Sequence, residues 1–445
     1  MFHLCPSAGW LVTILVVAST GCATYADRLT TVRQQFAAGN LAEADRELKK
    51  GLRRRSDRDC IKLDRAILQL ASGKPKEAEQ TLRVVRDRFD HLEQPAIAEI
   101  ALSTLTDANQ EAYAGEDYEK VLTRVFLALS NLMTDGGDAG AYALQVADKQ
   151  QQIIDAGVDQ HGENPKLAYQ RVALGPYLHG AIREETHANY DDVARSRAMV
   201  CSWQPNFPFG AQDLERARHG RHSAPGNGVL YVFALLGLGP HKEQAVEAPT
   251  TVSLLVADRI LSATGKHTLP PTIAPVKVPK VVLTPNSIHA IRVTVNGRAS
   301  GNTETITDIG RMAVDQYDAI YPRVIAEAVV RRVIKKAVIV GAKEATRTDR
   351  YSLAGVGFDM AGIAWEASES ADTRCWGLLP DKIQVLRLEL PAGQHQLSLQ
   401  SAGATGRVLG RPAIQIVTIE NGRNTYVLAN FPATDLVGSI LTNRR

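Results

Sequence analysis

The chain lacks several features that mark specialised classes of protein. Of its 445 residues only 6% are aromatic and the formal net charge is +3, so neither base stacking nor excess positive charge indicates nucleic-acid binding. Its five cysteines show no CxxC or Cys/His spacing of the kind that binds zinc. With 44% hydrophobic and 22% charged residues, the composition is that of a globular protein of two or three domains. We expect no metal or cofactor.

The sequence also lacks an apolar run of about 20 residues, which is the length that a membrane-spanning helix needs. The stretch 229–239 is shorter than that and is better read as a strand. The stretch 10–18, WLVTILVVA, is typical of the apolar region of a secretory signal peptide.

The residues after this run, Ser19-Thr20-Gly21-Cys22, resemble the lipobox of bacterial lipoprotein signal peptides. The resemblance implies cleavage between Gly21 and Cys22 and a diacylglycerol on the Cys22 sulfur. Ala23 replaces the Asp that retains such proteins at the inner membrane, which favours the outer membrane, facing the periplasm. A plain secretory signal and a buried N-terminal strand are the alternatives, because the first ten residues contain neither Lys nor Arg.

A repeat is visible in the Ala-, Leu- and Glu-rich part of the chain that follows. Three residue types recur at a separation of 34 residues. The pairs are Gly39 and Gly73, Ala44 and Ala78, and Leu48 and Leu82. This period resembles the tetratricopeptide repeat, in which two helices meet at a tight turn. Glycine permits the turn, the small Ala lets the helices approach, and Leu fills the groove between them. An unrelated helical bundle is the alternative.

Basic residues are concentrated at one point in this region, Lys49, Lys50 and Arg53 to Arg55. One interpretation is contact with anionic lipid headgroups, because the predicted anchor lies nearby in the sequence. The other is a solvated helix end whose cations complement the helix dipole, and we favour it because Asp57 and Asp59 dilute the charge.

The second half of the chain predicts mostly β-structure. Alternating segments indicate strands, and turns at 391–393 and 421–422 predict hairpins between neighbouring strands. The segment 251–257, TVSLLVA, is also predicted as a strand. One long helix is expected at 320–343, packed on the resulting sandwich.

Familiar catalytic motifs are missing from the sequence, including HExxH, GxSxG and the phosphate-binding GxxxxGK[ST]. The best local candidate for a site is formed by Asp372, Arg374 and Trp376, which strand geometry would place on one side. An Arg stacked on a Trp beside a carboxylate can bind an anionic ligand, but it can equally be a structural clamp. The disulfide state of the remaining cysteines, Cys60, Cys201 and Cys375, stays open.

Segments between residues 95 and 400 resemble a group of functionally uncharacterised bacterial proteins with an N-terminal repeat region. The matching pieces include PRVIAEAVVRRVIKK and, most specifically, Ala371-Asp372-Thr373-Arg374 followed by Trp376 and Leu379-Pro380. The resemblance implies an architecture and a place in the cell envelope, and no activity.

The expected fold class is α+β and multidomain: a tetratricopeptide-like helical array followed by a β-rich, sandwich-like domain with one long helix. The expected parts are a signal peptide 1–21, a tether 22–29, the helical domain 30–205, a linker 206–228 and the β-rich domain 229–445. The expected function is a non-catalytic, lipid-anchored envelope scaffold that binds partner proteins. The alternative is an envelope enzyme or a glycan- or anion-binding protein that uses the Asp372/Arg374/Trp376 region.

Overall fold

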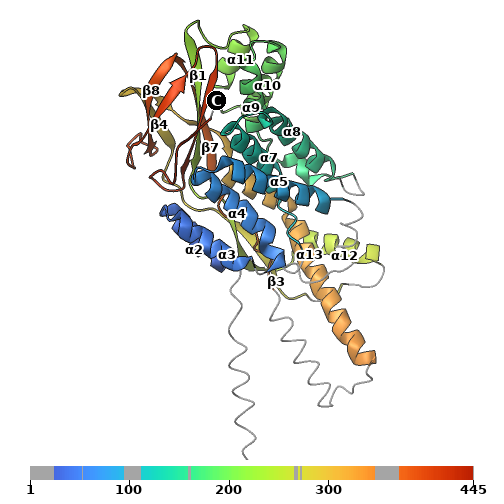
Figure 1. The fold of residues 1–445 in the computed structure, drawn as a ribbon. Helices are drawn as coiled ribbons and strands as arrows, with labels where there is room; N and C mark the ends of the chain where they lie inside the picture. The colour runs from blue at the N-terminus through green and yellow to red at the C-terminus, as the bar shows by residue number, and fades with distance from the viewer. Residues whose placement is uncertain are drawn as a thin grey trace, which may run out of the picture.

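The structure is a computed structural model that describes residues 25–52, 54–94, 112–158, 162–264, 269–270, 273–345 and 370–443. The predicted signal peptide, Gly21 and Cys22 lie outside these residues. The described part contains helices in its first half and mixed sheets in its second, so the chain is an α+β protein (Figure 1).

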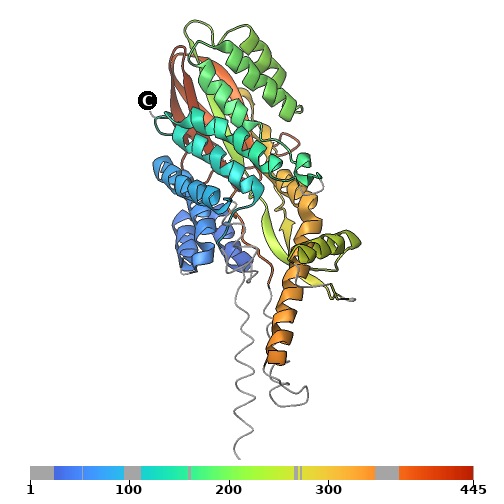
Figure 2. The same cartoon turned by 90° about the vertical axis from the view of Figure 1, so that its right-hand side faces the viewer.

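The first half consists of helices that pack against their neighbours in sequence. Figure 2 shows them, blue to green, rising in a stack along the length of the molecule. They are α2 (Tyr25–Ala37), α3 (Leu41–Gly51), α4 (Arg58–Ala71), α5 (Pro75–Leu92), α7 (Asp117–Leu132), α8 (Ala139–Asp155), α9 (Leu174–Glu184), α10 (Tyr190–Trp203) and α11 (Gly210–Arg218), with short 3₁₀ turns at Arg55–Asp57 and Pro165–Ala168.

The turns of the first two helix pairs have the same structure 34 residues apart. Gly39 and Gly73 both have a φ of +79°, a conformation that glycine adopts without steric cost. Each glycine N–H donates to the carbonyl three residues earlier, Phe36 and Leu70 respectively. The residues of the repeat that follow are buried, since Ala44, Ala78 and Leu82 are fully covered and Leu48 is 5% exposed. The sequence period therefore corresponds to a repeated helix–turn–helix unit.

The second half forms two main sheets. The five-stranded sheet has the order β11-β10-β1-β7-β6, and its β1–β10 pair is parallel while the others are antiparallel. The four-stranded sheet has the order β5-β4-β8-β9 and is antiparallel. The strands are β1 (Asn227–Leu236), β4 (Ala290–Val295), β5 (Arg298–Asn302), β6 (Glu304–Asp308), β7 (Lys382–Pro391), β8 (Gly393–Ala402), β9 (Ala413–Ile419), β10 (Asn424–Phe431) and β11 (Leu441–Thr442).

The five-stranded sheet is the middle layer of the molecule. On one face of β1, side chains such as Tyr231 and Phe233 join the core of the helical stack. On the other face, side chains such as Val232 and Leu236 pack against the four-stranded sheet. The predicted sandwich is thus present, and the helical stack covers it together with the first turns of the long helix, whose Ile309, Met312 and Ala313 enter the same core.

The two predicted hairpins are wrong, because each turn carries the chain from one sheet to the other. The turn at 391–393 joins β7 of the five-stranded sheet to β8 of the four-stranded sheet, and the turn at 421–422 returns from β9 to β10. Turn residues report that a strand ends, and they do not specify which sheet the next strand joins.

The long helix, α13 (Ile309–Ala345), begins eleven residues before the predicted start. Its first turns join the main core, and its later turns form a small second cluster. Pro322 lies inside the observed helix. The predicted strand 251–257 is wrong, because this segment begins α12 (Thr251–Thr264), whose Ala257 and Leu261 pack against α13. The antiparallel pair of β2 (His241–Glu247) and β3 (Val276–Val282), between which α12 lies in the chain, packs beside them.

The expected tether and linker are both corrected by the structure. Helix α2 begins at Tyr25, and its Leu29 is only 3% exposed. Residues 206–228 contain α11 and are partly buried. Phe207 joins the hydrophobic core, and Asp213, Arg216 and His222 take part in internal polar contacts described below. One hydrophobic core runs across the expected boundary between the helical and β-rich parts.

Candidate functional site

Of the three residues predicted from the sequence, Asp372 and Arg374 form an ion pair with each other. The Arg374 Nε and Nη2 atoms donate to the two Asp372 carboxylate oxygens at 2.8 and 2.7 Å. Arg374 also donates to the carbonyl oxygen of Ser56 at 3.0 Å and lies over the ring of Tyr113, 5.4 Å from its centroid. Its guanidinium therefore has its contacts within the protein.

Trp376 does not stack on Arg374, because residues 370–379 are irregular and do not form a strand. Its indole is fully buried and packs on Phe126, with the ring centroids 5.3 Å apart. Arg374 is 3% exposed. This geometry is that of a structural clamp, and it leaves no access for a ligand between the predicted residues.

The clamp is part of a segment, residues 371–381, that we call the strap. Buried side chains of the helices supply hydrogen bonds to its backbone: Glu119 accepts from the Trp376 N–H at 2.7 Å, and Asp64 accepts from the Leu378 N–H at 2.8 Å. Arg33 donates to the Gly377 carbonyl. Since a buried backbone group needs a partner, these three side chains fix the strap against the helical stack. Asp64 and Glu119 were not among the residues predicted from the sequence, although each is an acidic residue on a mostly apolar helix face.

The two acids that hold the strap are fully buried. Burial raises the pKa of Asp64 to about 7, against the opposing effect of its hydrogen bond from Leu378. Burial and the nearby Glu116 carboxylate raise the pKa of Glu119 to about 7. Each acid in the folded state thus retains its proton up to a higher pH than in the unfolded chain.

The free energy of unfolding should therefore depend on pH through these two groups. Between their ordinary values of 3.8 and 4.5 and about 7, the folded state binds more protons than the unfolded state, so stability falls as pH rises. The double variant Asp64→Asn/Glu119→Gln keeps one amide oxygen to accept from each strap N–H and should lose this slope, gaining stability relative to wild type at pH 8. Urea unfolding at several pH values measures it, with Glu77→Gln, 52% exposed, as control. An unchanged slope would contradict the assignment.

The three described cysteines and the histidines His179 and His222 are at least partly buried. Cys60, Cys201 and Cys375 are free thiols, and burial raises the pKa of each. His179 contacts the Ser196 hydroxyl at 2.9 Å, and His222 contacts the Asn424 side chain at 2.8 Å. Within the described ranges, the structure contains no group of three or more His, Cys, Asp or Glu residues placed to hold a metal ion.

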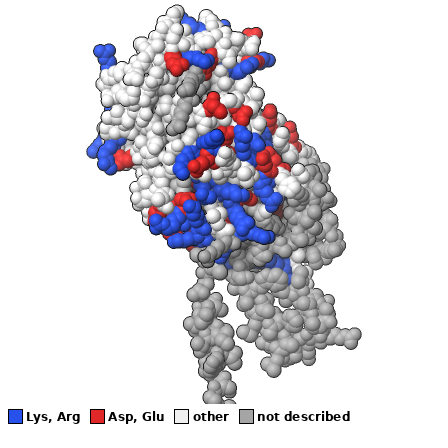
Figure 3. All heavy atoms as spheres, in the orientation of Figure 1, with Lys and Arg blue, Asp and Glu red and all other residues white. Residues whose placement is uncertain are grey.

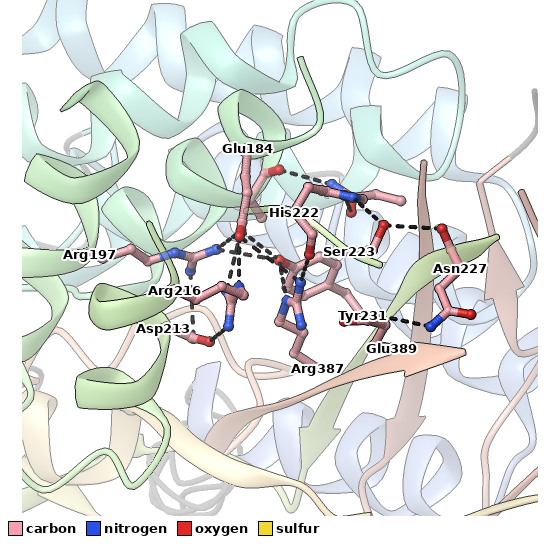
Figure 4. A network of polar contacts seen from close by, with 12 residues as sticks. Glu184, Arg197, Asp213, Arg216, His222, Ser223, Asn227, Tyr231, Arg387 and Glu389 are labelled. Carbon is pink, nitrogen blue, oxygen red and sulfur yellow. Dashed lines mark hydrogen bonds and ion pairs between the residues drawn. The ribbon is translucent and has the colours of Figure 1, made fainter. Parts of the chain in front are cut away.

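A second buried network joins the upper helices to the five-stranded sheet (Figure 4). Glu184 of α9 is fully buried, and three arginines approach its carboxylate. Arg197 of α10 lies at 3.1 Å, Arg216 of α11 at 2.7 Å and Arg387 of β7 at 4.0 Å. The Tyr231 hydroxyl of β1 lies 3.4 Å away. A single carboxylate thus connects three helices with the central sheet.

The electrostatics of this network favour the ionised acid. Burial alone would raise the pKa of Glu184, but the charge of Arg197 and the hydrogen bond and charge of Arg216 lower it to about 2. Asp213 supplies a second negative charge, 2.6 Å from Arg216. With Asp213 the site holds two acids for three arginines, so removing one acid leaves the arginines under-compensated in a buried site.

Glu184→Gln should therefore lower the free energy of unfolding by about 3–5 kcal/mol, the usual cost of removing one partner from a buried ion pair. The Glu184 contribution is present above its ordinary value of 4.5 and is lost as pH falls toward 2, so the difference from wild type should shrink in acid. Urea denaturation from pH 7 to 3 measures both effects. Glu215→Gln, 60% exposed, is the control, and an equal effect of the two variants would refute a structural role for the network.

The helical stack carries a concave surface, a groove of about 1080 Å³. We call it the helical groove. Its lining comes mainly from α5, α7 and α8, with Arg323 of α13 at one side. Six basic and five acidic residues line it: Arg86, Lys120, Arg124, Lys149, Lys166 and Arg323, and Asp87, Asp90, Glu93, Asp117 and Asp148.

The floor of the helical groove is formed by paired charges. Arg124 and Lys149, each 5% exposed, both bind Asp90, at 2.7 and 2.9 Å. Burial would raise the pKa of Asp90, but these two cations lower it. Lys166 similarly binds Asp117 at 2.7 Å. The pairs hold the neighbouring helices in place, while Asp148 and Gln152 of α8 are exposed at the groove.

Comparisons with known proteins give no assignment: no family model, no curated protein and no solved structure matches this chain. Within the described residues, we find no helix that is both long and apolar enough to cross a membrane.

Proposed function

We propose that this protein is a lipid-anchored scaffold of the cell envelope that binds partner proteins in the helical groove and has no catalytic activity of its own. The observation that carries this proposal is the groove itself. A stack of helix pairs presents an extended concave surface, which suits recognition of a protein segment. Its mixed charges suit a polar segment of a partner protein, because each exposed groove residue offers a directed contact at little desolvation cost. Nucleic acid is not part of the proposal.

The repeated turn supports a tetratricopeptide-type assignment for the first helices. The same hydrogen bonds recur at Gly39 and Gly73, and the small residues after them are buried at the helix contacts. This agrees with the resemblance to bacterial repeat proteins noted above, which we retain as a proposal.

The proposed anchor is the lipid on Cys22, and the proposed location is the outer membrane, facing the periplasm. The lipobox-like sequence supports it. Because α2 begins at Tyr25, a lipid on Cys22 would hold the folded body within about 10 Å of the bilayer surface, the reach of three residues. The alternative function at Asp372, Arg374 and Trp376 is less well supported, because the side chains of Arg374 and Trp376 are buried.

The anchor predicts a specific N-terminal modification. Mass spectrometry of protein purified from membranes should find an N-terminal peptide that begins at Cys22 and carries the mass of acyl chains, since stable anchoring requires more than one chain. Cys22→Ala should abolish the modification and Cys5→Ala should leave it intact. A peptide that begins at Met1, or an unmodified Cys22, would disprove the anchor.

The groove predicts a localised partner contact. A photo-crosslinking residue at Gln152, in the helical groove, should capture a partner in intact envelopes, whereas the same residue at Gln394, exposed on β8, should not. Deleting the helices is unsuitable as a test, because they share a core with the sheet.

Two charge-reversal variants, one in the groove and one outside it, test whether the crosslink depends on the charge of the groove. Asp148→Lys reverses an exposed charge in the groove and should reduce the Gln152 crosslink several-fold, while Asp258→Lys, exposed on α12, should not. Equal capture at Gln152 and Gln394, or a crosslink insensitive to Asp148→Lys, would count against the groove as the binding surface.

A further inference from the structure

A second charged surface of the molecule differs from the helical groove in being basic. Lys and Arg side chains gather over α3 and α4 on the lower part of the described surface (Figure 3). We call it the basal patch; its members are all exposed and are Lys49, Lys50, Arg54, Arg55, Arg58 and Arg88. The fold adds Arg88 of α5 to a cluster that the sequence places in one short stretch.

Three arginines of the basal patch line a shared hollow. Arg55 and Arg58 at the start of α4 face Arg88 and His91 of α5 across a depression of about 670 Å³. Lys62 lies in the same hollow and is paired with Asp59 at 2.9 Å. Since guanidinium groups bind phosphate oxygens with directed hydrogen bonds, this arrangement suits a phosphate-bearing headgroup.

The arginines of the patch differ from the cations of the helical groove in their pairing. In the groove, Arg124 and Lys149 are neutralised by Asp90. In the patch, Lys49 and Lys50 are paired with Asp45 and Glu47, both at 2.5 Å. Within the part of the chain that the structure describes, no ion pair is present for Arg54, Arg55, Arg58 or Arg88. Positive charge that the protein does not neutralise is available to an external anion.

The basal patch also lies beside α2, the first helix of the described chain. Arg28, in the first turn of α2, binds Asp57 at 2.7 Å, and Asp57 directly precedes α4. The start of α2 is therefore fixed to the same corner of the molecule as the patch. Cys22 lies three residues before Tyr25, so a lipid on it would enter the bilayer within about 10 Å of this corner.

We propose that the basal patch is a membrane-contact surface that binds the anionic headgroups of phospholipids beside the lipid anchor. This inference rests on the proposed anchor at Cys22 and adds an orientation to it. Basic residues near an anionic bilayer are each attracted to it within the Debye length, so the surface would act with the acyl chains. Asp87 lines both the hollow and the helical groove, so a bound partner would be held alongside the membrane.

Binding to vesicles by protein without its lipid tests this proposal. The probe is the chain from residue 22 onward with Cys22→Ser, and the readout is co-sedimentation with vesicles of phosphatidylcholine alone or mixed with phosphatidylglycerol. We expect binding only to the anionic vesicles, and loss of binding at high salt because the contact is electrostatic. Inorganic phosphate should displace the protein no better than sodium chloride of equal ionic strength.

Charge-reversal variants then locate the contact. The triple variant Arg55→Glu/Arg58→Glu/Arg88→Glu should weaken vesicle binding by at least about tenfold. Arg298→Glu/Arg407→Glu/Arg411→Glu makes the same change in net charge at exposed positions of the four-stranded sheet and its loops, and should bind like wild type. The corresponding Gln triple at the patch should be intermediate, and it replaces the Glu triple if that variant does not fold.

Two results would overturn the proposal: no binding of the Cys22→Ser chain to anionic vesicles at low salt, or equal weakening by the patch and control variants. Neither result bears on the anchor, because this protein carries no lipid. Acylation of Cys22 together with failed vesicle binding would therefore reject the patch and leave the anchor in place.

Discussion

The arrangement of this protein depends on burial of both faces of β1. From Val229 to Leu236 no residue is more than 1% exposed, and alternate side chains enter two different cores. One core belongs to the helical stack and the other to the space between the two sheets. A strand covered on both sides has to be apolar throughout, which accounts for the continuous run VLYVFALL. The helices and the sheets therefore form one body.

This shared interface also explains where the buried charges lie. The helices meet the β-rich half at surfaces that exclude water, so every polar group there needs a partner. Glu184 lies close to arginines from two helices and a strand. Asp64 and Glu119 accept hydrogen bonds from backbone N–H groups of the strap, which as an irregular segment has no strand partner for them. The first network favours an ionised acid because arginines pair directly with the Glu184 carboxylate. The second favours protonated acids because burial outweighs the opposing charge of Arg33 at Asp64 and that of Lys242 at Glu119.

The outer surfaces are divided by α5. The helical groove on one side has cations neutralised by acids of adjacent helices, whereas the basal patch on the other side holds arginines such as Arg55 and Arg88 near the start of the folded chain. A groove whose charges are already paired binds a partner by shape and by its exposed rim. A patch whose arginines are in no ion pair of the described structure suits an anionic surface with little need for shape. The two proposals thus assign different partners to the two sides of one helix.

The sequence by itself determined the local structure. Gly39 and Gly73 predicted repeated turns, and alternating residues predicted most strands, because turn geometry and strand periodicity depend on near neighbours in the chain. The tertiary structure alone decided which sheet each strand joined, that 251–257 became a helix, and that Asp372 and Arg374 formed a clamp. It also brought Glu184 to Arg387 and Asp64 to Leu378, contacts that a local pattern does not encode because their partners lie hundreds of residues apart.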